Sequence, residues 1–181
     1  MTVVERWQEF LKRWEGRHDR VVTLKGDSGG PTKWGITLNH VWKPKYARIF
    51  GKTPDAAGLA SMTWDEWARI TRDIWTASGA PLALTEPVAA ALADFSWHGG
   101  LSKKIREKAL GIEKTDPVAA FDYLAQAREF HLTHNVTDPE YKETNRRGWQ
   151  NRLNDLRKTF PPKPAAVPSP AAEPPNPTPS N

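Results

Sequence analysis

Most of the large apolar residues of this chain recur at the spacing of an α-helix. Near the N-terminus the pattern is formed by Trp7, Phe10, Leu11 and Trp14. It predicts an amphipathic helix that packs on a core, and Gly16 predicts the end of that helix. Thr63 and Glu66 have the spacing of a capping box. They precede a second run at helical spacing, formed by Trp64, Trp67, Ile70, Ile74 and Trp75. The sequence therefore predicts a mainly α-helical protein.

The second half of the chain adds three more expected helices. Pro87 suits a first helical position and opens the apolar segment 88–97, which a pair of glycines then ends. A second helix is expected to start at Asp116 and Pro117, and a last one to run from about residue 145 to 158. Two short pieces, 21–24 and 34–37, favour β-structure and predict a small hairpin around a glycine turn. The expected fold class is mainly α with a small β-hairpin element.

The C-terminal segment 161–181 differs in composition from the rest of the chain. It contains 9 of the 16 prolines and no apolar side chain larger than that of Val167. Such a segment buries too little apolar surface to offset its chain entropy, so we expect a disordered or extended tail. The folded part is therefore expected to span residues 1–160.

Composition excludes several kinds of chemistry. The chain has no cysteine, which excludes disulfides, cysteine metal ligands and a thiol nucleophile. Its five histidines show no metal-ligand spacing, so we expect neither a metal nor another cofactor. No apolar run approaches the roughly 20 residues of a membrane helix, and the charged N-terminus lacks the pattern of a signal peptide. We therefore expect a soluble protein that accumulates in the cytoplasm.

Positive charge is concentrated in the first third of the chain. Residues 1–54 contain 11 Lys and Arg against 5 Asp and Glu, whereas residues 55–160 contain 14 against 15. A positive field suits an anionic polymer, either nucleic acid or an acidic cell-wall surface, and it also promotes solubility. Charge alone does not choose between these interpretations.

The segment 14–37 combines residues that suit the cleavage of a glycosidic bond. Glu15 lies at the expected end of the first helix, and Asp27 and Thr32 lie on the glycine-rich turn that follows. Glycoside hydrolysis needs one carboxyl group that protonates the leaving oxygen and a second that positions water or stabilises the cationic transition state. We expect Glu15 to be the acid, Asp27 the second carboxylate and Thr32 a hydroxyl that orients the water. Asp19 is the alternative second carboxylate.

The same turn carries the residues that are expected to contact the substrate. Gly29 and Gly30 would let a sugar approach the backbone closely, and Trp34 could stack on a sugar face, as exposed tryptophans commonly do. Each signal is weak alone. A glutamate at a helix end is usually solvated, a DSGG sequence is more often an ordinary turn, and most tryptophans belong to a core. The hypothesis depends on the combination.

The run from Glu15 to Thr37 resembles the N-acetylmuramidase family of phage-type lysozymes, glycoside hydrolase family 108. That family opens with a glutamate–glycine–glycine motif, whose first two positions are matched by Glu15 and Gly16. Its D-P-G-G-x-T-x-x-G-I block is matched by Asp27, Gly29, Gly30, Thr32, Gly35 and Ile36. Weaker matches extend the resemblance to about residues 5–157, among them Asp94, Gly111-Ile112 and Gly148-Trp149-x-x-Arg152.

The resemblance implies a lysozyme-like fold and hydrolysis of the β-1,4 bond between N-acetylmuramic acid and N-acetylglucosamine. It implies Glu15 as general acid, within a catalytic set of Glu15, Asp27 and Thr32. We therefore interpret the chain as a peptidoglycan hydrolase of the endolysin type. We expect a monomer with no nucleic-acid partner, no integral membrane segment and no cofactor. Such an enzyme would need a holin or cell damage to reach the cell wall.

The expected organisation has three parts. Residues 1–100 form the catalytic region, residues 101–160 a helical region that completes the fold, and residues 161–181 the tail. In many relatives an asparagine-x-glycine sequence after the central helix leads into a small peptidoglycan-binding module. Here the sequence at that place is WHGG, so an alternative is that residues 101–160 are a relict of such a module.

Two other functions stay open at the level of sequence. A lytic transglycosylase or chitinase-type glycosidase would share the fold, but a transglycosylase typically uses one glutamate, so Asp27 and Thr32 favour hydrolysis. A non-catalytic protein that binds cell wall or nucleic acid would not need the intact set of three residues. The stereochemistry is also open. A carboxyl separation of roughly 6.5–9.5 Å implies inversion, and one of about 5–5.5 Å implies a covalent intermediate.

Overall fold

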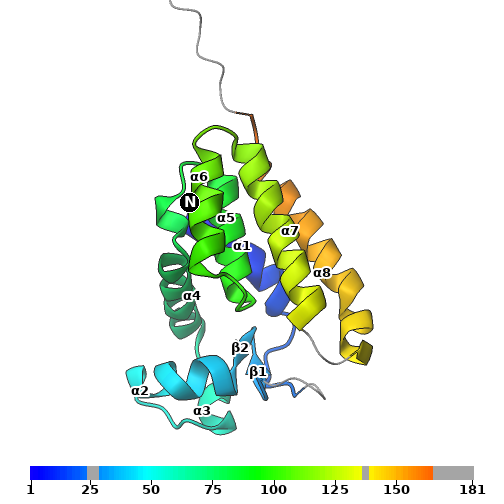
Figure 1. Ribbon diagram of the computed structural model, residues 1–181. Coiled ribbons are helices and arrows are strands. Elements are labelled where there is room, and N and C mark those ends of the chain that lie inside the picture. The colour runs from blue at the N-terminus through cyan, green and yellow to red at the C-terminus, as the bar shows by residue number, and fades with distance from the viewer. Residues whose placement is uncertain (24–28, 136–138, 165–181) are drawn as a thin grey trace, which may run out of the picture.

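The computed structural model describes residues 1–23, 29–135 and 139–164. This part of the chain is mainly helical and contains a two-stranded antiparallel sheet, which confirms the expected fold class (Figure 1). In chain order the elements are α1 (Val3–Glu15), β1 (Thr32–Lys33), β2 (Ile36–Thr37), the π-helix η1 (Leu38–Tyr46), α2 (Ala47–Ile49), α3 (Ala56–Ala60), α4 (Trp64–Ser78), the 3-10 helix η2 (Ala80–Leu82), α5 (Glu86–Trp97), α6 (Lys103–Glu113), α7 (Pro117–Asn135) and α8 (Pro139–Thr159).

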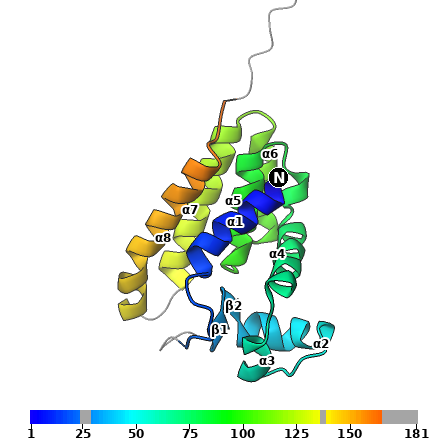
Figure 2. The ribbon, with the colours of Figure 1, turned by 180° about the vertical axis from the view of Figure 1, so that it is seen from behind.

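Helix α5 lies at the centre of the molecule. Its residues from Val88 to Phe95 are all buried, as expected for a helix that is apolar on every side. The helices α1, α4, α6, α7 and α8 all contact α5. Figure 2 shows α1 crossing one side of this bundle, with α7 and α8 running side by side along its edge. The core is therefore built around the buried middle of one helix.

Helix α1 begins and ends where the sequence predicts a boundary. At its start Thr2 and Glu5 form a capping box, each accepting a hydrogen bond from the backbone N–H of the other. At its end Gly16 donates its N–H to Lys12 O at 2.9 Å. A Cβ at Gly16 would lie 2.6 Å from that carbonyl oxygen, which explains why a glycine ends the helix. Glu15 is thereby held at the last position of α1.

Helix α4 also confirms its predicted start. The Thr63 hydroxyl accepts from Glu66 N at 3.3 Å, and the Glu66 carboxylate accepts from Thr63 N at 2.8 Å. Trp67 and Ile70 are fully buried on the face that packs on the core. The capping box therefore predicts where this helix begins, and the apolar spacing predicts which face is buried.

The β-hairpin differs from the expected one. The predicted second strand, 34–37, begins two residues too early, because Trp34 and Gly35 form the turn between β1 and β2. Both turn residues have positive φ, 50° and 76°, as in the two-residue turns that suit the twist of a hairpin. Val22 adds a bridge to Thr32, with both backbone hydrogen bonds at 2.8 Å. The rest of the predicted first strand reaches residue 24, which lies outside the described residues.

The second half of the chain is more helical than expected. Helix α6, which Ser102 caps through a hydrogen bond from Ile105 N, was not predicted. Helix α8 begins at Pro139 rather than near residue 145. After α8 the buried Phe160 closes the core, and residues 165–181, most of the predicted tail, lie outside the described residues. Among the described helices none combines the length and apolar character needed to cross a membrane.

Candidate active site

The Glu15 side chain lines a groove between the β-hairpin and α8. The groove has a volume of about 550 Å³, and the Glu15 side chain is 22% exposed. Its walls come from four parts of the chain: the end of α1, the hairpin, the end of α5 and the middle of α8. The lining residues are Trp14, Glu15, His18, Val22, Thr32, Trp34, Gly35, Thr37, Trp97, His98, Gly148, Trp149 and Arg152. Glu15 is the one carboxylate among these lining residues of the described chain.

Two donors hold the Glu15 carboxylate by the same oxygen. Trp97 Nε1 donates to Oε1 at 3.0 Å, and Arg152 Nη1 donates to the same atom. Gly35 lies against the other side of the carboxyl group, where an added Cβ would be 3.0 Å from both Cδ and Oε2. Because the hydrogen bonds from described residues reach Oε1, a proton carried by Glu15 belongs on Oε2.

Arg152 connects Glu15 to a second carboxylate in the core. Its Nε and Nη2 donate to Asp94 Oδ1 at 3.1 and 2.7 Å. Arg128, from α7, places Nε 3.3 Å from Asp94 Oδ2 as a further ion pair. We call Glu15, Asp94, Arg128 and Arg152 the ion cluster. It holds two carboxylates and two guanidinium groups, so its formal charges balance, as buried charges require.

The protonation states in the ion cluster follow from burial and charge. Burial alone would raise the pKa of the Asp94 carboxyl, but Arg152 and Arg128 outweigh it and hold that pKa well below its usual range. Burial would lower the pKa of the Arg152 guanidinium, but Asp94 and Glu15 reverse this and raise it. Asp94 is therefore an anion and Arg152 a cation throughout the physiological range.

His98 borders the ion cluster as a neutral side chain. Burial, together with the charges of Arg128 and Arg152, lowers its pKa well below the usual value. Its Nδ1 lies 2.8 Å from the Asp94 carbonyl oxygen, and its Nε2 lies 3.2 Å from Arg128 Nη2. A neutral ring that donates from Nδ1 and accepts at Nε2 satisfies both contacts. His98 is thus a half-buried residue at the end of α5, with both ring nitrogens engaged.

The structure brings two of the three predicted catalytic residues to one groove. Thr32, on β1, lines it together with Glu15, and its hydroxyl donates to Gly30 O at 3.1 Å. Asp27 lies outside the described residues. The alternative carboxylate, Asp19, is absent from the groove lining; its side chain is 82% exposed and lies 3.7 Å from Lys33 Nζ. The choice between Asp27 and Asp19 stays a prediction.

The predicted substrate contacts serve local packing in the structure. Gly29 O accepts from Asn39 N at 3.0 Å, and a Cβ at Gly30 would lie 2.8 Å from Asn39 Nδ2. Trp34 lines the groove but is only 4% exposed. Its ring stacks on Trp64 at 3.7 Å between centroids. The described turn therefore packs against η1 and α4.

Sequence reasoning assigned no role to the residues that hold Glu15. For Asp94 the sequence does contain a signal of a structural role, since a carboxylate inside the apolar run of α5 needs a buried partner. For Arg152 the signal is weaker: it lies at helical spacing with the apolar residues Trp149 and Leu156, which places it on the same face of the helix. Trp97 has no sequence signal that separates it from the core tryptophans. Its contact with Glu15 joins residues 82 positions apart.

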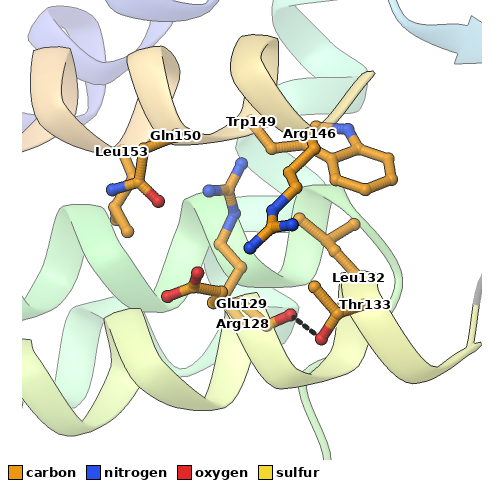
Figure 3. Close-up of a pocket in the computed structure, with 8 residues that line it drawn as sticks. All are labelled: Arg128, Glu129, Leu132, Thr133, Arg146, Trp149, Gln150 and Leu153. Carbon is orange, nitrogen blue, oxygen red and sulfur yellow. Dashed lines mark hydrogen bonds between the residues drawn. The ribbon is translucent and has the colours of Figure 1, made fainter. Parts of the chain in front are cut away.

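A second cavity lies between α7 and α8; Glu15 does not line it, but Trp149 lines both this cavity and the groove. Figure 3 shows its lining, with Glu129 and Leu132 from α7 facing Arg146 and Trp149 from α8. Its volume is about 20 Å³, which suits a single water molecule rather than a sugar. In the described residues no group of three or more His, Asp or Glu side chains is placed to hold a metal ion.

Comparison with protein families gives one match for this region. The family described as Glycosyl hydrolase 108 matches residues 8–100, slightly more than half of the chain. The matched range contains Glu15, the hairpin, Asp94 and Trp97, and it ends before α6. Arg128 and Arg152 therefore lie outside the part of the chain that the family comparison covers.

A comparison with solved structures supports the architecture of the whole described chain. A structure of SagA from Brucella abortus matches with a TM-score of 0.63 at 18% sequence identity, covering 86% of this chain and 91% of that one. Among curated proteins no match is found. At this identity the likeness concerns the fold, and it confirms the lysozyme-like, mainly helical architecture expected from the sequence.

Proposed function

This chain belongs to the glycosyl hydrolase 108 family and is a glycoside hydrolase, and from that premise we propose that it is a peptidoglycan-degrading muramidase. Its reaction is hydrolysis of the β-1,4 bond between N-acetylmuramic acid and N-acetylglucosamine. The observation that carries the proposal is the orientation of Glu15. Its carboxyl group lies in a groove, with Oε1 held by Trp97 and Arg152.

In this mechanism Glu15 protonates the leaving glycosidic oxygen. The two donors occupy Oε1, so the proton is delivered from Oε2 beside Gly35. Held by two hydrogen bonds, the carboxyl group keeps one orientation when a sugar enters, and this lowers the entropic cost of reaching the transition state. General acid catalysis of this kind is worth about 10²–10⁴-fold in rate.

Thr32 is proposed to orient the attacking water. The hydroxyl proton of Thr32 is already used in the hydrogen bond to Gly30 O. The oxygen lone pairs are then available to accept a hydrogen bond from a water in the groove. Asp27 stays the proposed second carboxylate, and it would activate that water or stabilise the positive charge on the sugar ring.

The test is an analysis of the products released from purified peptidoglycan. Wild type should release fragments with a reducing N-acetylmuramic acid end. Glu15→Gln keeps the shape and the two hydrogen-bond contacts at Oε1 but cannot donate a carboxyl proton, so it should lose at least about 10²-fold in rate. A well-folded Glu15→Gln variant with more than a tenth of the wild-type rate would contradict the assignment.

A lytic transglycosylase is the second candidate, and one observation favours it. Glu15 is the one carboxylate among the groove-lining residues that the structure describes, and a single acid suffices for a transglycosylase. Mass spectrometry separates the two reactions, because intramolecular cleavage gives anhydro products that are lighter by one water. Activation of a water by a second carboxylate is needed only for hydrolysis. The Asp27→Asn and Asp19→Asn variants therefore extend the same test.

An endolysin-type role is proposed as the biological setting. The basic first third of the chain would favour the anionic cell wall. In this role the enzyme works as a monomer that accumulates in the cytoplasm and reaches the wall after a holin or cell damage opens the way. Size-exclusion chromatography tests the oligomeric state, and fractionation of producing cells before and after lysis tests the location.

A further inference from the structure

A glycine lies in the middle of α8, on the wall of the groove. Gly148 is a lining residue, well inside a helix that runs from Pro139 to Thr159. Glycine destabilises the interior of a helix relative to alanine, because it loses more backbone freedom on folding. A glycine at such a position can have a reason in the packing of the protein or in what approaches it.

The packing of the protein supplies no such reason within the described residues. Gly148 is not among the glycines with positive φ, and a Cβ built on it meets no described atom within 4 Å. Other glycines of this chain are different. A Cβ at Gly35 would lie 2.5 Å from the Trp97 ring, and one at Gly79 would lie 2.5 Å from Arg106 Cδ. With respect to the described residues, Gly148 therefore borders open space.

That open space lies next to the catalytic groups. Arg152 follows Gly148 by four positions, so the two residues share one face of α8, one helical turn apart. Arg152 contacts Glu15, which places the space above Gly148 about one turn of helix from the proposed acid. Trp149, labelled on α8 in Figure 3, also lines the groove. A glycine, an aromatic ring and an arginine thus form the α8 wall of the groove.

We propose that the α8 wall, formed by Gly148, Trp149 and Arg152, is a saccharide subsite for the pyranose ring next to the bond that is cleaved. The absence of a side chain at Gly148 lets that ring lie against the helix. The tryptophan supplies an apolar surface of the kind that packs on sugar faces. The proposal rests on the glycosidase function and assigns part of substrate recognition to residues beyond the range 8–100 that the family match covers.

Gly111 provides a matched control. It is also a helical glycine, in α6, and a Cβ built on it likewise meets no described atom within 4 Å. It does not line the groove. Alanine and glutamine can be placed at both positions, since both residues favour helices and neither would clash with the described protein. The two pairs of variants differ in whether the new side chain projects into the groove.

The first experiment measures stability and turnover. Neither alanine variant should lower the melting temperature, and Gly148→Ala should raise it by about 2–4 °C, because helix propensity improves. With a soluble tetrasaccharide of alternating N-acetylglucosamine and N-acetylmuramic acid, Gly148→Gln should lower kcat/KM at least about tenfold, mainly through KM. Gly148→Ala should have a smaller effect in the same direction, and both Gly111 variants should match wild type.

The second experiment separates this inference from the proposed function. In a Glu15→Gln background, which cannot cleave, calorimetry measures binding of the same tetrasaccharide. Weaker binding on adding Gly148→Gln, with no change on adding Gly111→Gln, supports the subsite. If wild type cleaves and Gly148→Gln binds and cleaves equally well, the subsite is refuted while the function stands. If wild type neither binds nor cleaves the tetrasaccharide, the proposed function fails and the subsite fails with it.

Discussion

Arg152 links the groove to the core through one side chain. It donates to Glu15 on one side and to Asp94 on the other. Replacing arginine by lysine keeps the charge but loses the planar fork that reaches two carboxylates at once. The orientation of Glu15 therefore depends on the geometry of this guanidinium group as well as on its charge.

Arg152→Gln is expected to lower kcat by about 10²-fold or more while KM changes little, because the proposed general acid Glu15 loses its fixed orientation. Arg152→Lys should recover part of kcat. Arg147→Gln makes the same charge change at an exposed position of α8 and should behave as wild type. A folded Arg152→Gln variant with the wild-type kcat would leave Arg152 a purely structural role.

His98 gives the molecule a defined dependence of stability on pH. Its pKa is lowered in the folded state, whereas the unfolded chain binds a proton near pH 6.5. Stability from this residue is therefore fully present above about pH 6.5 and is lost as the pH falls below it. Urea unfolding of wild type should therefore show a free energy of unfolding that falls between pH 7 and pH 5.

The His98→Gln variant should lose most of this pH dependence, because the titrating group is gone. His40→Gln, at an exposed position of η1, should keep the wild-type dependence. Equal slopes for wild type and His98→Gln would show that another group causes the acid sensitivity.

At the scale of elements, the hairpin turn packs against Glu15 at the end of α1, and Thr32 and Glu15 line the same groove. Gly35 has a φ of 76° and sits between the Trp97 ring and the Glu15 carboxyl group. Gly35→Ala should cost about 1–3 kcal/mol of stability through backbone strain and the clash with Trp97. It should also lower kcat more than tenfold, because the added methyl group would push on Glu15.

Chemical denaturation and turnover on purified peptidoglycan measure the two effects of Gly35→Ala. Gly51→Ala is the control, since Gly51 also has positive φ but faces open space among the described residues. It should cost stability without lowering the activity of the remaining folded enzyme. Equal activity losses in the two variants would mean that backbone strain, and not the contact with Glu15, explains the result.

The helices that carry local signals were predictable from sequence, and the contacts between them were not. The capping box at Thr63 correctly predicted the start of α4, and Gly16 correctly predicted the end of α1. Both signals depend on interactions within a few residues. Helix α6 was missed, and α8 was predicted too short at its N-terminal end, because their apolar patterns are weak. The hairpin was misplaced because Trp34 adopts positive φ, which no propensity favours for tryptophan.

In the candidate site, too, the residues of a local motif were predictable and the long-range contacts were not. Glu15 and Thr32 were identified by a local motif, and both line the groove. The contacts of Glu15 with Trp97 and Arg152 span 82 and 137 positions of sequence. Such contacts depend on how α1, α5 and α8 pack against one another. A sequence pattern within one helix does not indicate that packing.

For the whole molecule, the ion cluster joins α5 to α7 and α8, so we expect residues 1–100 to depend on residues 101–160 for their fold. Asp94 lies on α5, but both guanidinium groups that neutralise it come from α7 and α8. Truncation after residue 100 would remove Arg128 and Arg152 and would uncover α5. An unpaired buried charge costs about 3–5 kcal/mol, a large share of the roughly 5–15 kcal/mol that stabilises a domain.

We therefore expect the fragment 1–100 to be unfolded and inactive, even though it contains the range that the family match covers. Truncation after residue 164 keeps all eight α-helices of the described chain and the buried Phe160. It should retain the melting temperature of full length within about 4 °C, roughly 1 kcal/mol for a chain of this size, together with full wall-lysis activity. Circular dichroism and lysis assays on both fragments provide the measurement. A folded, active fragment 1–100 would show that the catalytic region is an independent domain and that α7 and α8 are an addition to it.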